Sequence, residues 1–327
     1  MGGRLDPQVA TARTLVRTAV AELEPGQTVL VAVSGGADSL ALAAAAAFVC
    51  AQQGLRGGAA LIDHRLQPGS SDIAARAAEQ VRGLGFDPVE VIAVDVGGQG
   101  GPEAAARSAR YAALSASAER HEARAVLLGH TLDDQAETVL LGLARGSGPR
   151  SLAGMAPVDG IYRRPFLTLS RTQTERVCVA SGLDWWQDPH NRDSAYARVR
   201  VRRDALPALE RTLGPGVTEA LARTAALVRD DVDLLDQLAG EAWSDVSTAD
   251  GLAVRGLIKL ARALRTRIIR RAALEAGAPA TDLAAVHIGE VDRLLINWHG
   301  QQRVELPGGV VAVRRGDTLS IARSVAG

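Results

Sequence analysis

Apolar and polar residues follow a repeating order along the first two thirds of the chain. Short apolar runs at 29–33, 58–62, 88–94 and 125–128 predict buried strands, with a shorter one at 161–163. Between them lie segments with apolar residues at helical spacing, namely 7–24, 37–50, 71–84, 103–120, 132–143 and 170–180. Strands that alternate with helices predict an α/β fold with a parallel, doubly wound sheet, which binds ligands at the carboxyl ends of its strands.

The pattern changes after residue 213. Helical spacing runs through 217–239, 251–276 and 282–298, and strand patterns follow at 303–306, 310–314 and 319–322. A chain of 327 residues is long enough for two domains. We therefore expect a larger domain over residues 1–213 and a smaller, mainly helical domain over 217–327 that ends in short strands.

Composition narrows the function classes. The hydrophobic fraction of 47% is ordinary for a globular protein, and the only two cysteines, Cys50 and Cys178, lie in apolar helical patterns that favour buried thiols. With no Cys-x-x-Cys pair, a zinc or iron–sulfur site built on cysteine is not expected. The N-terminus has no continuous apolar segment, and the apolar run 41–50 is too short to span a bilayer, which predicts a cytoplasmic protein without membrane contact.

The charge distribution says more than the net charge of zero. Residues 252–271 contain seven basic residues and no acidic one. Arginine dominates the basic residues of the chain and suits bidentate phosphate contacts. By themselves, this stretch and the arginines of 198–203 fit a solvated helix face as well as an RNA-binding surface.

The segment Ser34-Gly35-Gly36-Ala37-Asp38-Ser39 joins the first predicted strand to a helix. Glycines let the backbone approach an anion, and the amides and dipole of a helix N-terminus stabilise it. A Walker A loop is excluded because the only lysine is Lys259, and a dinucleotide-binding fingerprint does not fit. The segment matches the Ser-Gly-Gly-x-Asp-Ser loop of the N-type ATP pyrophosphatases, which implies ATP cleavage between the α and β phosphates. A carboxylate beside phosphate implies a bridging Mg²⁺, with Asp38 as its ligand.

A second polar cluster begins at the end of the fourth predicted strand. The sequence from Gly129 to Thr138 places His130 and the carboxylates of Asp133, Asp134 and Glu137 at the start of one helix. Acids in a first helical turn also serve as caps, but their position directly after a strand favours a site. Such carboxylates can hold Mg²⁺ or receive an ammonium group, and His130 can act as a base or contact the nucleotide.

Taken in order, these motifs resemble the tRNA(Ile)-lysidine synthetase family of the PP-loop superfamily. The motifs that carry the resemblance, over about 28–210, are the loop at 34–39, Asp63-His64, Arg107-Ser108-Ala109-Arg110-Tyr111, the block at 129–138, Arg145-Gly146-Ser147-Gly148, Leu152-x-Gly154-Met155, Arg164-Pro165-Phe166-Leu167, residues 186–191, Tyr196-Ala197-Arg198 and Leu206-Pro207. Three departures stand out: Thr131 replaces a second histidine, Val199 replaces an asparagine, and Asp63-His64 lacks an asparagine before the histidine.

The resemblance implies a ligase that uses ATP and Mg²⁺ to attach L-lysine to C2 of the wobble cytidine of an isoleucine tRNA with a CAU anticodon. The base is adenylated first, and AMP and pyrophosphate are released. A homodimer is compatible with the sequence, which does not decide it.

The resemblance also assigns roles to residues. The catalytic residues it implies are Asp38, Arg110, His130, Asp134 and Arg202. The nucleotide would be bound by Ser34, Gly35, Gly36, Ala37, Asp38, Ser39 and His64, and substrate or Mg²⁺ would lie near Asp133, Asp134, Glu137, Arg107 and Arg145. For tRNA binding we expect Arg198, Arg267 and Arg271.

Two alternatives remain open at this point. A tRNA thiolase of the same superfamily would share the loop, but that chemistry generally needs reactive or cluster-binding cysteines. A module that senses ATP without turnover would not need the acidic cluster at 133–137.

Overall fold

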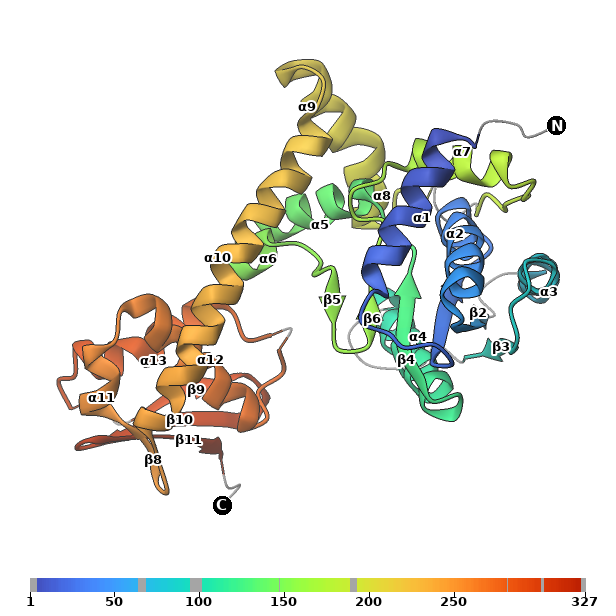
Figure 1. Ribbon diagram of the computed structural model, residues 1–327. Helices are drawn as coiled ribbons and strands as arrows, with labels where there is room; N and C mark the ends of the chain where they lie inside the picture. Colours follow the sequence, from blue (N-terminus) through green and yellow to red (C-terminus); the bar gives the residue numbers. More distant parts are fainter. Residues whose placement is uncertain are drawn as a thin grey trace. The chain divides into compact units, whose positions relative to one another are not determined.

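The computed structural model describes residues 5–63, 69–94, 102–146, 148–188, 193–280, 282–300 and 303–324. The chain forms two compact units (Figure 1). The first comprises Met1–Leu141 and Gly154–Arg223, and the second comprises Gly142–Ala153 and Thr224–Gly327. Within the described ranges, no helix is both long enough and apolar enough to cross a membrane.

A six-stranded sheet forms the centre of the first unit, in the order β3-β2-β1-β4-β6-β5. All neighbouring strands pair in parallel except β5 and β6, which are antiparallel. The strands are β1 (Thr28–Val33), β2 (Arg56–Asp63), β3 (Val89–Ala93), β4 (Ala123–Leu128), β5 (Val158–Asp159) and β6 (Tyr162–Arg163). The predicted parallel sheet is confirmed, and β5 is an edge strand that the sequence pattern did not predict.

Helices cover both faces of this sheet, as a doubly wound fold requires. One apolar cluster packs β1 and β2 against four helices, and a second packs Leu30 and Val126 against Leu114 and Ala118 of α4 (Pro102–Arg120). The four helices of the first cluster are α1 (Pro7–Ala19), α2 (Ala37–Gln53), α3 (Ser70–Gly83) and α7 (Arg171–Ala180).

The strand order places the functional segments together. The chain leaves β1 toward β2 and β3 and then returns to β4 on the other side of β1. Because Ala32 pairs with Leu128, the segments that start at Ser34 and Gly129 leave the sheet next to each other. This reversal of strand order is where doubly wound sheets bind their ligands.

Among the described residues, five further helical segments come after β4 in the chain, between residues 132 and 213. They are α5 (Leu132–Ala144), α6 (Pro149–Leu152), α8 (Ala197–Arg200), η2 (Val201–Ala205) and α9 (Leu206–Leu213). The η2 turn is a π-helix and contains Arg202. Single π-turns inside helices are frequent at functional sites.

The second unit combines helices with a five-stranded antiparallel sheet in the order β7-β8-β11-β10-β9. Its helices are α10 (Val217–Val246), which begins in the first unit, α11 (Val254–Lys259), α12 (Arg262–Glu275), α13 (Ala285–Ile296) and the 3₁₀ turn η3 (Pro307–Gly309). Its strands are β7 (Ser247–Thr248), β8 (Gly251–Ala253), β9 (Arg303–Leu306), β10 (Val310–Arg315) and β11 (Thr318–Arg323).

The prediction of one helix over 251–276 is wrong. Residues 251–253 form β8 instead, because they pair with β7 on one side and β11 on the other, and Gly251 has φ +140°, which a continuous helix would not allow. Leu260 and Ala261 then have extended backbone between α11 and α12. Pairing across the second unit therefore overrides the local helical spacing.

Candidate active site

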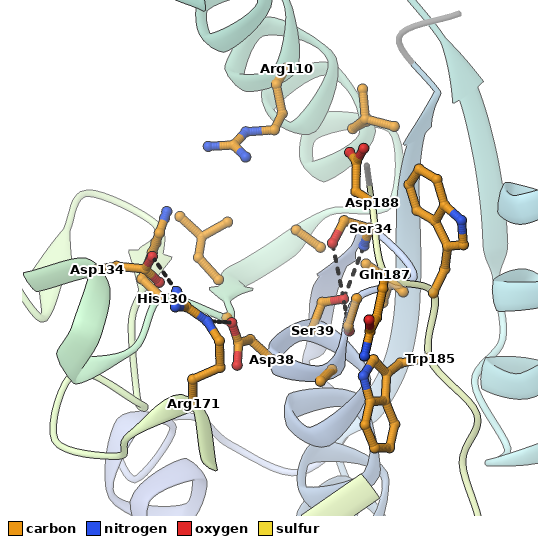
Figure 2. Close-up of a pocket in the computed structure, with 18 of the residues that line it drawn as sticks. Ser34, Asp38, Ser39, Arg110, His130, Asp134, Arg171, Trp185, Gln187 and Asp188 are labelled. Atoms are coloured by element: carbon orange, nitrogen blue, oxygen red, sulfur yellow. Dashed lines mark hydrogen bonds and ion pairs between the residues drawn. The ribbon is translucent and has the colours of Figure 1, made fainter. Parts of the chain in front are cut away.

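A cavity of about 620 Å³ lies at the carboxyl ends of β1 and β4. Its walls come from the loop 34–39, the start of α5 with the residues before it, the first turn of α7, and segments 185–188 and 198–202. Figure 2 shows side chains from these segments gathered around the cavity, with Arg110 reaching in from α4. Segments far apart in the sequence thus meet where the fold places a ligand.

The loop at 34–39 is built from its own hydrogen bonds. The Ser34 N–H donates to Ser39 Oγ over 3.1 Å, and the Ser39 hydroxyl donates to the Gly36 carbonyl over 2.9 Å. Gly35 has φ +81°, so a left-handed residue is needed there. Gly36 caps α2 without a side-chain acceptor, so the first-turn amides of the helix are not capped from within. This geometry suits an anion such as a phosphate.

Asp38 lies on the first turn of α2, where its carboxylate faces α7. The Thr174 hydroxyl donates to it, and Arg171 Nε lies 3.5 Å from Oδ2. Burial raises the pKa of Asp38 to about 6, although Arg171 and Thr174 oppose this shift. The carboxylate is therefore ionised at neutral pH but close to its point of protonation.

Asp134 and Glu137 occupy one face of α5. Asp134 accepts the Thr131 N–H over 2.9 Å and lies 3.2 Å from Arg171 Nη2. Burial disfavours the charge, but Arg171 and the Thr131 N–H hold the pKa of Asp134 below its usual value. Glu137 is fully buried, and burial raises its pKa against the effect of Arg202.

The charges of Asp134 and Glu137 are balanced by Arg198 and Arg202, in addition to Arg171. Arg202 Nε lies 2.6 Å from Glu137 Oε1, and Arg198 Nε lies 3.2 Å from Glu137 Oε2. Arg202 also approaches Asp134 to 3.6 Å. We expected Arg198 to bind tRNA; the structure places it in the cavity wall, where it pairs with Glu137 and donates to the Thr138 hydroxyl.

His130 and Arg110 line the opposite part of the cavity. Burial lowers the pKa of His130 to about 3, and the neighbouring Arg110, Arg164 and Arg107 add to the effect against the pull of Asp134. His130 Nδ1 and Arg110 Nε are buried without a hydrogen-bond partner among the described residues. A neutral imidazole beside a guanidinium nitrogen without a partner suits an anionic ligand, whose oxygens can accept from Arg110 Nε.

Three further expected site residues, Arg107, Asp133 and Arg145, are not among the residues that line the cavity. Arg107 is exposed on α4 and donates to the Tyr111 hydroxyl over 3.4 Å. Asp133 accepts the Arg171 N–H over 2.8 Å and does not line the cavity. Arg145 is exposed just after α5, in the second unit. His64 lies outside the described residues.

The arginines expected on α12 have partners within the second unit. Arg267 Nε lies 2.9 Å from Asp236, and Arg271 Nε lies 2.8 Å from Glu275, while the Arg271 guanidinium sits over the Trp243 ring. The basic stretch of 252–271 is therefore partly an internal ion-pair network of this unit rather than an unpaired basic face.

Several cavity residues were given no role from the sequence, although Trp186 and Gln187 belong to the motif at 186–191 that carried the resemblance. Arg171 and Glu175 come from α7, and Trp185, Trp186 and Gln187 come from the segment after it. The Trp186 N–H donates to the Gly35 carbonyl over 3.0 Å and so ties this segment to the loop. Adjacent tryptophans in a chain with only four were an available signal.

A magnesium ion would find few protein ligands here. Among the described residues, no group of three or more His, Cys, Asp or Glu side chains is placed to hold a metal. Mg²⁺, however, is usually held by one or two carboxylates together with substrate phosphates and water. Asp38, at the phosphate loop, fits that mode.

Neither cysteine lines the cavity. The buried Cys178 thiol donates to the Ala37 carbonyl over 3.2 Å, and burial raises the pKa of Cys178 to about 12 and that of Cys50 to about 11. Protonated, buried thiols do not suit sulfur-transfer chemistry.

The chain matches two family models. Residues 8–209 match the PP-loop domain, and residues 252–319 match the TilS substrate binding domain. In the fold comparison, a U34-tRNA thiolase with a [4Fe-4S] cluster, NcsA from Methanococcus maripaludis, aligns with a TM-score of 0.57 over 68% of this chain and 80% of that one. At 17% identity this likeness concerns the fold alone.

Close relatives span nearly the whole chain. The tRNA(Ile)-lysidine synthase of Thermobifida fusca is 57% identical over 303 residues, which cover 92% of this chain and 94% of that protein. The tRNA(Ile)-lysidine synthase of Streptomyces coelicolor is 59% identical over 297 residues, which cover 90% of this chain and 84% of that protein. With both matched domains and this identity along its length, the chain belongs to the tRNA(Ile)-lysidine synthase family.

Proposed function

We propose that this chain attaches lysine to C2 of the wobble cytidine in an isoleucine tRNA with a CAU anticodon. In the first step the C2 oxygen attacks the α-phosphorus of ATP, the bond to the β-phosphate breaks, and pyrophosphate leaves. In the second step the lysine ε-amine attacks C2, the C–O bond breaks, and AMP leaves with the oxygen. The ammonium proton passes to a base before or during the second step.

One observation carries the proposal most directly. The cavity has one wall with an uncapped helix N-terminus and the loop at 34–39, and a second wall with the Asp134 carboxylate of α5. The first wall suits the β and γ phosphates of ATP, and the second suits an ammonium group. An enzyme that joins an amine to an adenylated base needs both.

Arg110 and His130 support the adenylation step in this proposal. Charge builds on the transferring phosphoryl group, and Arg110, whose Nε has no hydrogen-bond partner among the described residues, can stabilise it. Because its pKa is far below neutral, His130 contributes a neutral imidazole, which donates one hydrogen bond and accepts another. Asp38 would hold Mg²⁺, which supplies further charge neutralisation when it is bound.

For the amine step we propose Asp134 as the group nearest the lysine ammonium. Its carboxylate lines the cavity, whereas Glu137 lies beneath it and is occupied by Arg198 and Arg202. Glu137 then acts through these arginines, by holding them at the cavity wall.

Contacts with the body of the tRNA are proposed for the domain over residues 217–327. Arg267 and Arg271, expected for this role, already pair with acids of the same unit, whereas a groove of about 650 Å³ beside the sheet has four arginines and no acidic residue among its described lining residues. The four are Arg303, Arg314, Arg315 and Arg323. Such a groove is complementary to a phosphate backbone. Residues 1–213 would then form the catalytic domain of a cytoplasmic enzyme.

The proposal is tested by following AMP and pyrophosphate release with unmodified isoleucine tRNA and ATP, with and without lysine. With lysine we expect AMP and pyrophosphate in equal amounts, both dependent on tRNA, and without lysine we expect pyrophosphate release without matching release of AMP. Nucleotide binding without AMP release would support an ATP-sensing module instead. Sulfur in the product after addition of a sulfide donor would support a thiolase.

A further inference from the structure

Arg171, the first residue of α7, contacts carboxylates from two other helices. Its Nε lies 3.5 Å from Asp38 Oδ2 on α2, and its Nη2 lies 3.2 Å from Asp134 Oδ1 on α5. The same Nη2 lies 3.8 Å from Glu137 Oε1. Figure 2 shows the guanidinium between Asp38 and Asp134, at the rim of the cavity.

The two carboxylates that Arg171 joins have different tasks in the proposed reaction. Asp38 belongs to the nucleotide wall, and Asp134 belongs to the amine wall. The two carboxylates are like charges and repel each other. A cation between them is therefore needed to keep both ionised side chains facing the same cavity.

The arginine is itself held in place from several sides. Its backbone N–H donates to Asp133 over 2.8 Å, and the Leu132 N–H donates to the Leu169 carbonyl over 2.8 Å, so α5 and α7 start next to each other. The Ser170 side chain caps α7 in a capping box with Gln173. Only 26% of the Arg171 side chain is exposed. The guanidinium group of Arg171 is thus held in position before any substrate binds.

We propose that Arg171 is a positioning residue that fixes Asp38 and Asp134 relative to each other and so sets the distance between the nucleotide and the attacking amine. The inference rests on the proposed function and adds a residue that joins its two half-sites. In the proposed function the nucleotide is bound through the loop amides and Arg110, and the amine is bound by the Asp134 carboxylate, which remains when Arg171 is removed. Loss of Arg171 therefore disturbs alignment rather than affinity.

The test compares Arg171→Gln, Arg171→Lys and the control Arg176→Gln, an exposed position on the same helix. We expect Arg171→Gln to lower kcat for lysidine formation about 100-fold, since small misplacements of reacting groups cost that much. Its KM values for ATP and lysine should stay within about threefold of wild type. Arg171→Lys restores a charge without the fork, so its kcat should lie between the two, and Arg176→Gln should match wild type.

Other outcomes overturn the inference. A wild-type kcat in Arg171→Gln, or a loss that appears in KM and follows a fall in melting temperature, would assign Arg171 a structural role only. If Arg171→Gln does not fold, a kcat for the folded Arg171→Lys equal to wild type overturns the inference as well. Wild-type protein that transfers no lysine would overturn the proposed function and this inference together, whereas active wild type with equally active variants overturns the inference alone.

Discussion

Arg202 holds the fully buried Glu137 through both carboxylate oxygens, with Nε 2.6 Å from Oε1 and Nη2 3.1 Å from Oε2. The pair links the π-turn η2 to α5 beneath the cavity. Bidentate arginine–carboxylate pairs fix orientation as well as charge. The position of the cavity wall at 198–202 thus depends on a glutamate that the ligand does not need to touch.

Breaking this pair should destabilise the first unit. We expect Arg202→Gln to lower the free energy of unfolding by about 3 kcal/mol, because it leaves a buried carboxylate with weaker compensation from Arg198. The double variant Glu137→Gln with Arg202→Gln should lose less than the sum of the two single changes. Urea unfolding of the three variants measures this coupling, and strictly additive losses would contradict it.

Gly129 is required by a close approach of backbones. A Cβ atom at this position would lie 3.0 Å from the carbonyl carbon and oxygen of Asp38 and 3.1 Å from Ser39 Cα. We expect Gly129→Ala to push the first turn of α2 away from β4 and to weaken ATP binding at least tenfold. Calorimetric titration with ATP measures the effect. In the control Gly83→Ala the new Cβ meets no atom within 4 Å, and unchanged ATP affinity is expected there.

The raised pKa of Asp38 predicts a pH-dependent effect on stability. The folded pKa of about 6 exceeds the ordinary value of 3.8, so the folded state binds a proton that the unfolded state has released between these pH values. Stability from this group is therefore present below pH 4 and lost as the pH rises through 6. Asp38→Asn, which mimics the protonated form, should be more stable than wild type by up to about 3 kcal/mol at pH 8.

That gain should fade as the pH falls toward 4. Urea unfolding at several pH values, in buffer with EDTA and without nucleotide, measures it. If Asp38→Asn is less stable than wild type at pH 8, the conclusion that burial destabilises the Asp38 charge is contradicted. The same variant should lose activity. The buried Asp38 charge would then be a group that destabilises the fold but is needed for catalysis.

The arginines of the second unit fall into two groups with different expected effects. Arg315 and Arg323, in the groove, have no ion pair among the described residues, whereas Arg267 pairs with Asp236. The double change to glutamate at 315 and 323 should weaken tRNA binding and make it less dependent on salt, by about 0.9 in the slope of log K against log salt for each lost contact. Filter binding over a salt series measures this effect.

Arg267→Glu should instead lower the melting temperature, because it places two acids together at Asp236. Equal effects of both sets on tRNA affinity, without a difference in stability, would contradict the division. Arg293→Glu, on the exposed part of α13, serves as the surface-charge control.

The sheet and the phosphate loop could be predicted because each depends on residues that are close together in the sequence. The run at 29–33 is apolar and followed by two glycines, and strand–helix alternation alone implies parallel pairing. The break of the helix predicted over 251–276 was not predicted, because β8 is defined by its pairing with β7 on one side and with the distant β11 on the other. Strand pairing between distant segments overrides helical spacing there.

Some of the residues that line the cavity could be predicted because they lie in local sequence motifs. Asp38, His130 and Asp134 come from segments with strong motifs, and the strand order brings them to one cavity. Arg171 carries no motif, and a basic residue in the first turn of a helix is unfavourable for the helix dipole. That unfavourable placement was its only local signal; the carboxylates that compensate it come from two other helices.

The most direct test of the account is transfer of radiolabelled lysine to unmodified isoleucine tRNA with a CAU anticodon, with ATP and Mg²⁺. Wild type, Asp38→Ala and a methionine tRNA with the same anticodon are compared. We predict ATP-dependent label on the isoleucine tRNA only, and its loss in Asp38→Ala. No label with wild type, or equal label on the methionine tRNA, would contradict the proposed reaction.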